Sequence, residues 1–188
     1  MAATTVLSHG SSARRATYDR IYTVNNHTVV AAAGDYPDYQ YLTEIIRQKQ
    51  IDEKQSDEGF ELYPAALHSW ITRVAYEKRF VLQPLWNTWV VRGLQPNQTN
   101  DKCEPFLGCV DKLGAAFKSN VVAPPFGDYL GTPAFRELLE KKDQLPSETE
   151  ARALVKKCMK VLFFRSEPEY QVVVVKENEV HKEGPAEI

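Results

Sequence analysis

The sequence lacks the cysteine pattern of a disulfide-bonded or zinc-binding protein. Its 188 residues include only three cysteines, Cys103, Cys109 and Cys158. An odd number, with five residues between the first two, fits neither a disulfide framework nor a CxxC metal or redox site. We therefore expect reduced thiols, as in a protein of the cytoplasm or nucleus.

The chain also lacks a dominant charge and a long hydrophobic run. Its 23 Lys and Arg nearly balance its 25 Asp and Glu, so no cationic field would attract phosphate backbones or anionic lipids. The longest apolar runs, 28–34 and 172–175, are far shorter than the roughly 20 residues of a membrane-spanning helix, and no apolar signal segment opens the chain. We expect a soluble intracellular protein that binds neither nucleic acid nor a membrane.

Sequence motifs for cofactors are missing as well. The chain has no GxxxxGK[ST] and no GxGxxG after a strand, so nucleotide binding has no support. Four histidines are scattered without the HxxxH or HExxH spacing that places two donors on one metal: His9, His27, His68 and His181. We expect no cofactor and no metal site.

The hydrophobic periodicity predicts strands and helices in separate blocks. The expected elements are strands at 20–24 and 27–33, helices from Asp35 to about Asp52 and from Pro64 to about Phe80, strands at 85–91, 105–111 and 115–119, helices at 134–142 and from Ser147 to about Leu162, and strands at 170–175 and 179–181. Between them, 52–59 is expected to be a charged loop and 95–104 a polar hairpin tip. Segregated blocks of this kind predict an α+β fold with stacked sheets and outer helices, in a single domain spanning 1–188.

A search for a nucleophile gives little. Ser11, in Gly10-Ser11-Ser12, does not form a GxSxG elbow between a strand and a helix. Thr4 and Thr5 lie near the N-terminus, and a threonine whose own α-amine is exposed can act as a nucleophile. Composition and spacing alone define no more than a globular α+β domain.

Seven short strings, in order along the chain, carry a family resemblance. They are Val24-Asn25-Asn26, Gly34-Asp35-Tyr36-Pro37-Asp38-Tyr39-Gln40-Tyr41-Leu42, His68-Ser69-Trp70-Ile71-Thr72-Arg73, Pro84-Leu85-Trp86-Asn87-Thr88, Gly108-Cys109-Val110-Asp111-Lys112-Leu113-Gly114, Thr149-Glu150-Ala151-Arg152 and Glu183-Gly184-Pro185. Together they resemble 20S proteasome beta subunits, in particular those at the seventh position of the beta ring. The match runs from about Ala2 to Pro185.

The resemblance implies an Ntn-hydrolase fold, a four-layer αββα sandwich with two antiparallel sheets between two helix layers. In catalytic family members, a nucleophilic threonine opens a strand hairpin that ends in Ala-Ala-Asp. Because Ala2-Ala3 fall on that Ala-Ala pair, the resemblance implies that the N-terminal strand hairpin is missing.

The family register also implies that the catalytic positions are degenerate. Thr4 falls where catalytic members have Asp, and Arg20 falls where they have Lys. Near the other end, Ser166 replaces an Asp and Glu169 replaces a Ser. Arg stays protonated, whereas a desolvated Lys can lose its proton, so Arg20 cannot shuttle a proton to a threonine. We therefore expect no catalytic residue in this chain.

The function implied is architectural: a non-catalytic subunit of the beta ring that helps to enclose the chamber in which the complex, a threonine endopeptidase, degrades proteins of the ubiquitin pathway. The expected partners are beta subunits of the same ring, alpha-ring subunits and beta subunits of the opposite ring, in the cytoplasm and nucleus. The alternative is a free-standing Ntn-type threonine hydrolase formed by N-terminal processing.

Overall fold

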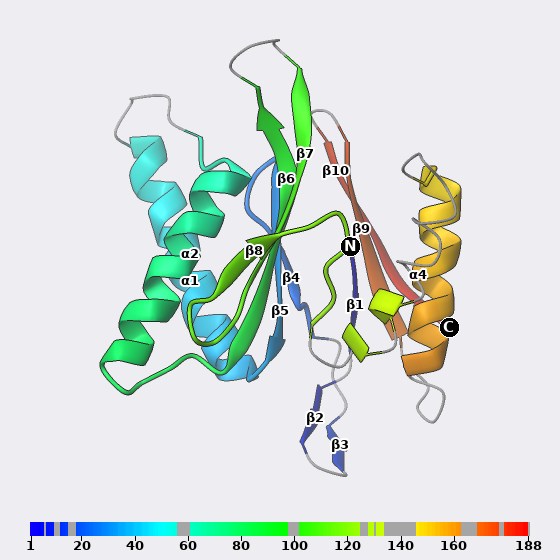
Figure 1. Ribbon diagram of the computed structural model, residues 1–188, viewed down its shortest axis with the longest axis horizontal. Coiled ribbons are helices and arrows are strands. Elements are labelled where there is room, and N and C mark those ends of the chain that lie inside the picture. The colour runs from blue at the N-terminus through cyan, green and yellow to red at the C-terminus, as the bar shows by residue number, and fades with distance from the viewer. Residues whose placement is uncertain are drawn as a thin grey trace.

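A computed structural model of the chain shows strands and helices arranged in four layers (Figure 1). It describes residues 1–5, 7–9, 12–14, 18–55, 61–97, 102–124, 128–129, 131–133, 146–162, 169–176 and 179–187. The helices with assigned bounds are α1 (Tyr36–Gln55), α2 (Pro64–Phe80) and α4 (Glu148–Leu162). The strands are β1 (Ala2–Thr4), β2 (Leu7–His9), β3 (Ser12–Arg14), β4 (Ile21–Thr23), β5 (Thr28–Gly34), β6 (Asn87–Pro96), β7 (Cys103–Val110), β8 (Ala116–Lys118), β9 (Glu169–Lys176) and β10 (Glu179–Glu187).

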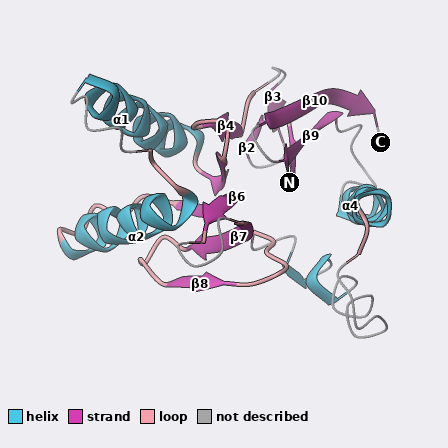
Figure 2. Ribbon diagram, turned by 90° about the horizontal axis from the view of Figure 1, so that it is seen from above, coloured by secondary structure: helices cyan, strands magenta, loops and turns pink. Residues whose placement is uncertain are grey.

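Two antiparallel sheets form the inner layers. The larger sheet has the order β4-β5-β6-β7-β8, and the smaller has the order β1-β9-β10. Seen from above, α1 and α2 lie outside the larger sheet and α4 lies outside the smaller one (Figure 2). This confirms the α+β fold with stacked sheets and outer helices. Within the described residues, strands β2 and β3 pair with each other and with no further strand.

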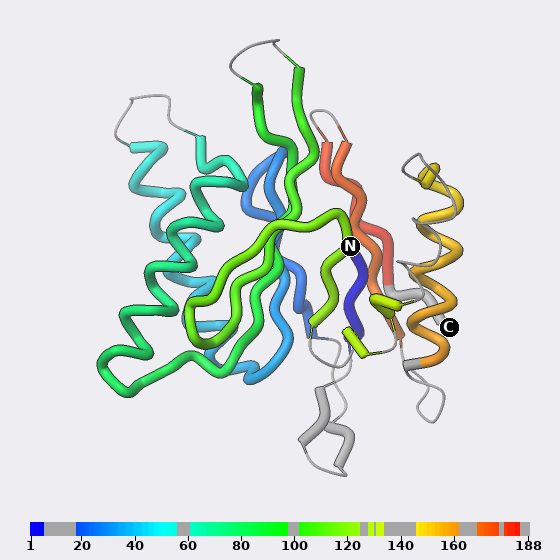
Figure 3. The backbone as a smooth tube through the Cα atoms, viewed as in Figure 1, coloured from blue at the N-terminus to red at the C-terminus, as the bar shows by residue number. Residues whose placement is uncertain are grey.

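The start of the chain lies beside a strand near its end. The backbone trace brings the N-terminus next to β9 (Figure 3), where the Met1 amine donates a hydrogen bond to the Val173 carbonyl over 2.9 Å. The three residues of β1 then pair with β9, with Ala2 opposite Val172. Among the described residues, no strand pairs with the other side of β1. The smaller sheet is thus built from segments about 170 residues apart in sequence.

The main hydrophobic core lies between the helix pair and the larger sheet. Helix α2 contributes Leu67, Ile71 and Ala75, which recur at helical spacing and are almost fully buried. Trp89 and Val91 of β6 alternate toward the same core, as expected for every second residue of a strand. Burial of these side chains fixes the helix pair on one face of the sheet.

A second, smaller core lies between the two sheets. Its buried members are Ile21, Val29 and Ala31 from the larger sheet and Val173 and Val175 from β9. Because Val29 and Ala31 alternate with Val30, which faces the helices, β5 is hydrophobic on both faces. This explains the continuous apolar run at 28–34.

Local signals in the sequence account for the helix starts. The Asp35 carboxylate accepts a hydrogen bond from the Asp38 N–H at 3.3 Å, and Pro64 occupies the first turn of α2. Ser147 and Glu150 exchange the two bonds of a capping box, Ser147 N–H to Glu150 at 3.0 Å and Glu150 N–H to the Ser147 hydroxyl at 3.4 Å. The predicted starts of these three helices are confirmed.

Several predicted boundaries were wrong. Strand β6 continues to Pro96, and strand β7 begins at Cys103. Both ends of the polar tip predicted at 95–104 are therefore strand. Gln95 pairs with Glu104 in the ladder, and its side chain accepts a hydrogen bond from the Ala65 N–H at 3.1 Å, which explains a polar residue in that strand. The first strand was predicted at 20–24, but β1, β2 and β3 precede it. The helix predicted at 134–142 lies outside the described residues.

None of the described helices is long and apolar enough to cross a membrane. The assignment of 1–188 to one domain stays a prediction.

Candidate functional site

The structure brings together two of the four degenerate positions, Thr4 and Glu169. Thr4 lies in β1 opposite Tyr170 of β9, the residue after Glu169. The next residue, Thr5, donates from its N–H and from its hydroxyl to the Glu169 carbonyl, each over 3.1 Å. The carbonyl of Glu169 thus holds the end of β1 against β9.

Arg20 lies two residues after Tyr18, which bonds to the end of β1, and its own backbone bonds to β5. The Tyr18 N–H donates to the Thr5 carbonyl at 3.0 Å, and the Arg20 carbonyl accepts from Ala32 at 3.3 Å. Burial lowers the pKa of the Arg20 guanidinium, while nearby Tyr36 acts in the opposite direction. Even so, an arginine remains protonated at neutral pH. The fourth predicted position, Ser166, lies outside the described residues.

The threonine geometry suits a structural role. Thr5 is 1% exposed, and its hydroxyl is used in the bond to Glu169. Thr4 lies within β1, so cleavage before it would remove Ala2 and Ala3, which make two of the three residue pairs that join β1 to β9. An amine-activated nucleophile needs a free N-terminal threonine and a base that can accept a proton, and Arg20 cannot accept one. The prediction of no catalytic residue stays a prediction.

A polar bridge that sequence reasoning missed lies next to this corner. The Asp19 carboxylate accepts hydrogen bonds from Gln171 at 2.7 Å and from Lys182 at 2.8 Å. Partial burial alone would raise the pKa of Asp19, but the bonds from Lys182 and Gln171 outweigh it and lower that pKa. Asp19 is 163 residues from Lys182, so no local pattern could have predicted the contact.

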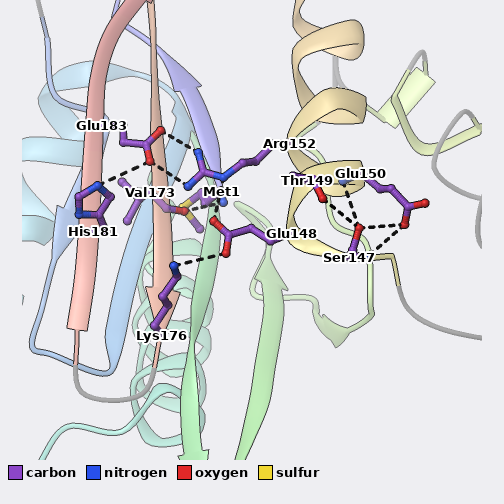
Figure 4. Close-up of polar contacts among 10 residues, drawn as sticks. All are labelled: Met1, Ser147, Glu148, Thr149, Glu150, Arg152, Val173, Lys176, His181 and Glu183. Atoms are coloured by element: carbon purple, nitrogen blue, oxygen red, sulfur yellow. Dashed lines mark hydrogen bonds and ion pairs between the residues drawn. The ribbon is translucent and has the colours of Figure 1, made fainter.

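Helix α4 is attached to the smaller sheet by an ion-pair network (Figure 4). Arg152 donates two hydrogen bonds to the Glu183 carboxylate, at 2.7 and 2.8 Å, and one to Glu148 at 2.9 Å. Lys176 lies 3.4 Å from Glu148, and His181 lies 3.6 Å from Glu183. The bonds from Arg152 lower the pKa of both glutamates, and the bond to Glu183 raises the pKa of Arg152.

The strings that carry the family resemblance contact one another elsewhere as well. Between α1 and the start of β6, the Trp86 N–H donates to the Asp38 carboxylate at 2.8 Å, and the Asn87 amide donates to the Asp35 carbonyl at 2.7 Å. Asn87 is buried, with 3% of its surface exposed, so its amide supplies the hydrogen bond that water would otherwise give to the Asp35 carbonyl. These bonds fix the start of α1 to the start of β6, the central strand of the larger sheet.

A similar contact joins α2 to β7. The His68 ring is buried, and its Nε2 lies 3.2 Å from the Cys109 carbonyl oxygen. A Cβ at Gly108 would lie 2.5 Å from the His68 ring, so only glycine allows this approach. Burial also raises the pKa of the Cys109 thiol to about 11, which leaves it an unreactive thiol at neutral pH.

No group of three potential metal-binding side chains occurs in the part of the chain that the structure describes.

Two antiparallel sheets between outer helices are the layer order of an Ntn-type α+β sandwich. Comparison with known proteins gives the family. A sequence profile for proteasome subunits matches residues 1–177. The chain belongs to the proteasome subunit family, whose members assemble with other proteasome subunits.

The individual relatives are eukaryotic beta subunits. The chain is 45% identical over 181 residues to proteasome subunit beta type-4 of Xenopus laevis, covering 95% of this chain and 72% of the relative. It is 35% identical over 191 residues to proteasome subunit beta type-4 of Drosophila melanogaster, covering 100% and 69%. It is 29% identical over 171 residues to proteasome subunit beta type-7 of Saccharomyces cerevisiae, covering 88% and 62%.

Proposed function

We propose that this chain is a non-catalytic, structural subunit of the 20S proteasome beta ring, at the position that beta type-4 subunits occupy. Support comes from the similarity to beta type-4 subunits of two animals along most of the chain. The role is to complete the ring and to help enclose the chamber in which other subunits degrade proteins of the ubiquitin pathway.

The observation that carries the non-catalytic part is the use of the threonines at the corner between β1 and β9. Thr5 is buried and bonded to Glu169, and Thr4 lies within the strand that pairs with β9. Arg20 stands in the chain where catalytic family members have Lys, and as a permanently protonated group it cannot take part in the proton transfer that such a Lys allows.

The partners follow from a ring architecture. A subunit in a closed ring makes different contacts with its two neighbours, which here are beta subunits of the same ring. Further contacts reach the alpha ring and the opposite beta ring. The complex would act in the cytoplasm and the nucleus.

Native mass spectrometry of the complex purified through a tag on this chain tests the proposal. We expect the chain as a stoichiometric member of a 20S particle, two copies per particle, with its residues 1–5 intact. Recovery of the chain only as a monomer or small dimer would contradict the proposal.

A matched pair of substitutions addresses the alternative, a threonine hydrolase. In particles carrying Thr4→Ala we expect all peptidase activities to remain at the wild-type level. Thr4→Val is the matched control, because it keeps the β-branched shape in the strand. Loss of one peptidase activity in both variants, with the particle intact, would instead support a catalytic Thr4.

A further inference from the structure

We draw no further inference here: the strongest candidate, the exposed apolar surface patch around Leu82 at the end of α2, where the backbone takes a φ of 58°, carries none because nothing in the structure shows what covers it.

Discussion

Arg152 of α4 and Glu183 of β10 form a two-pronged ion pair, with N–O distances of 2.7 and 2.8 Å. Each residue belongs to a short string that resembles beta subunits, and the strings are 31 residues apart. A planar guanidinium facing a carboxylate fixes orientation as well as distance. The pair therefore sets the position of the outer helix on the smaller sheet.

Substitution of Arg152 by Ala should loosen α4 without unfolding the larger sheet. Removing the side chain breaks the bonds to Glu183 and Glu148 together. We expect faster amide hydrogen exchange in 151–162 and unchanged exchange in β5 and β6. Arg152→Lys keeps the positive charge but cannot form the two parallel hydrogen bonds of a guanidinium, so the amide exchange rate of α4 should be intermediate. Unchanged exchange of α4 in Arg152→Ala would show that the pair does not position the helix.

The same network predicts an acid dependence. The hydrogen bonds from Arg152 lower the pKa of Glu183 and of Glu148 below the ordinary value of 4.5. A carboxylate with a lowered pKa contributes stability above its unfolded pKa and loses that contribution as the pH falls through the folded pKa. Exchange protection of α4 should therefore decline below pH 4.5 in the wild type, and the decline should be weaker in Arg152→Ala. Equal acid profiles would contradict this.

The close approach of His68 to β7 should make Gly108 sensitive to any side chain. Because a Cβ there would lie 2.5 Å from the His68 ring, Gly108→Ala should lower the free energy of unfolding by about 1–3 kcal/mol. Adding His68→Ala removes the clash, so the double variant should be more stable than the sum of the two single changes predicts. Urea unfolding measures all three, and strict additivity would rule out the clash.

The capping box at the start of α4 gives a further test. Ser147→Ala removes the hydroxyl that accepts the Glu150 N–H, so it should lower the free energy of unfolding by about 1 kcal/mol. Thr149→Ala is the control, because the Thr149 hydroxyl, 3.3 Å from the Ser147 hydroxyl, takes part in neither bond of the capping box. Equal effects of the two substitutions in thermal unfolding would show that the cap contributes nothing specific.

Leu82 should respond in the opposite sense. In the purified chain, Leu82→Gly relieves a left-handed backbone and should raise the free energy of unfolding by about 1 kcal/mol, or the melting temperature by about 2–4 °C. Leu82→Met should leave both unchanged. A lower melting temperature for Leu82→Gly would show that its side chain already has a stabilising contact within the chain.

The sequence predicted the helices well because their signals are local. Leu67 and Ile71 recur at helical spacing and are both buried, and the Ser147 and Glu150 pair forms the bonds that its spacing implies. The family register assigned Thr4 and Glu169 to two catalytic positions; the structure places Thr4 opposite Tyr170, the residue after Glu169, and their assignment as degenerate catalytic positions stays a prediction. Such features depend on neighbours along the chain or on a known alignment.

Contacts between distant segments could not be predicted in this way. Strand β1 has three residues, too few for a period to be visible, and it exists because β9 supplies its hydrogen bonds. The bridge from Asp19 to Lys182 joins exposed polar residues that no pattern distinguishes from a solvated surface. The conformation of Leu82 follows from the bonds that close α2, and leucine itself gives no signal for it.

The central claim is that this chain is a member of the 20S particle without a catalytic threonine. The most direct test treats the intact particle with an electrophile that reacts with N-terminal threonines and then measures the intact mass of every subunit. We predict that the mass of this chain is unchanged, with residues 1–5 present, while catalytic beta subunits of the same particle gain the mass of the probe. A probe adduct on this chain, at a new N-terminal Thr4 or Thr5, would contradict the account.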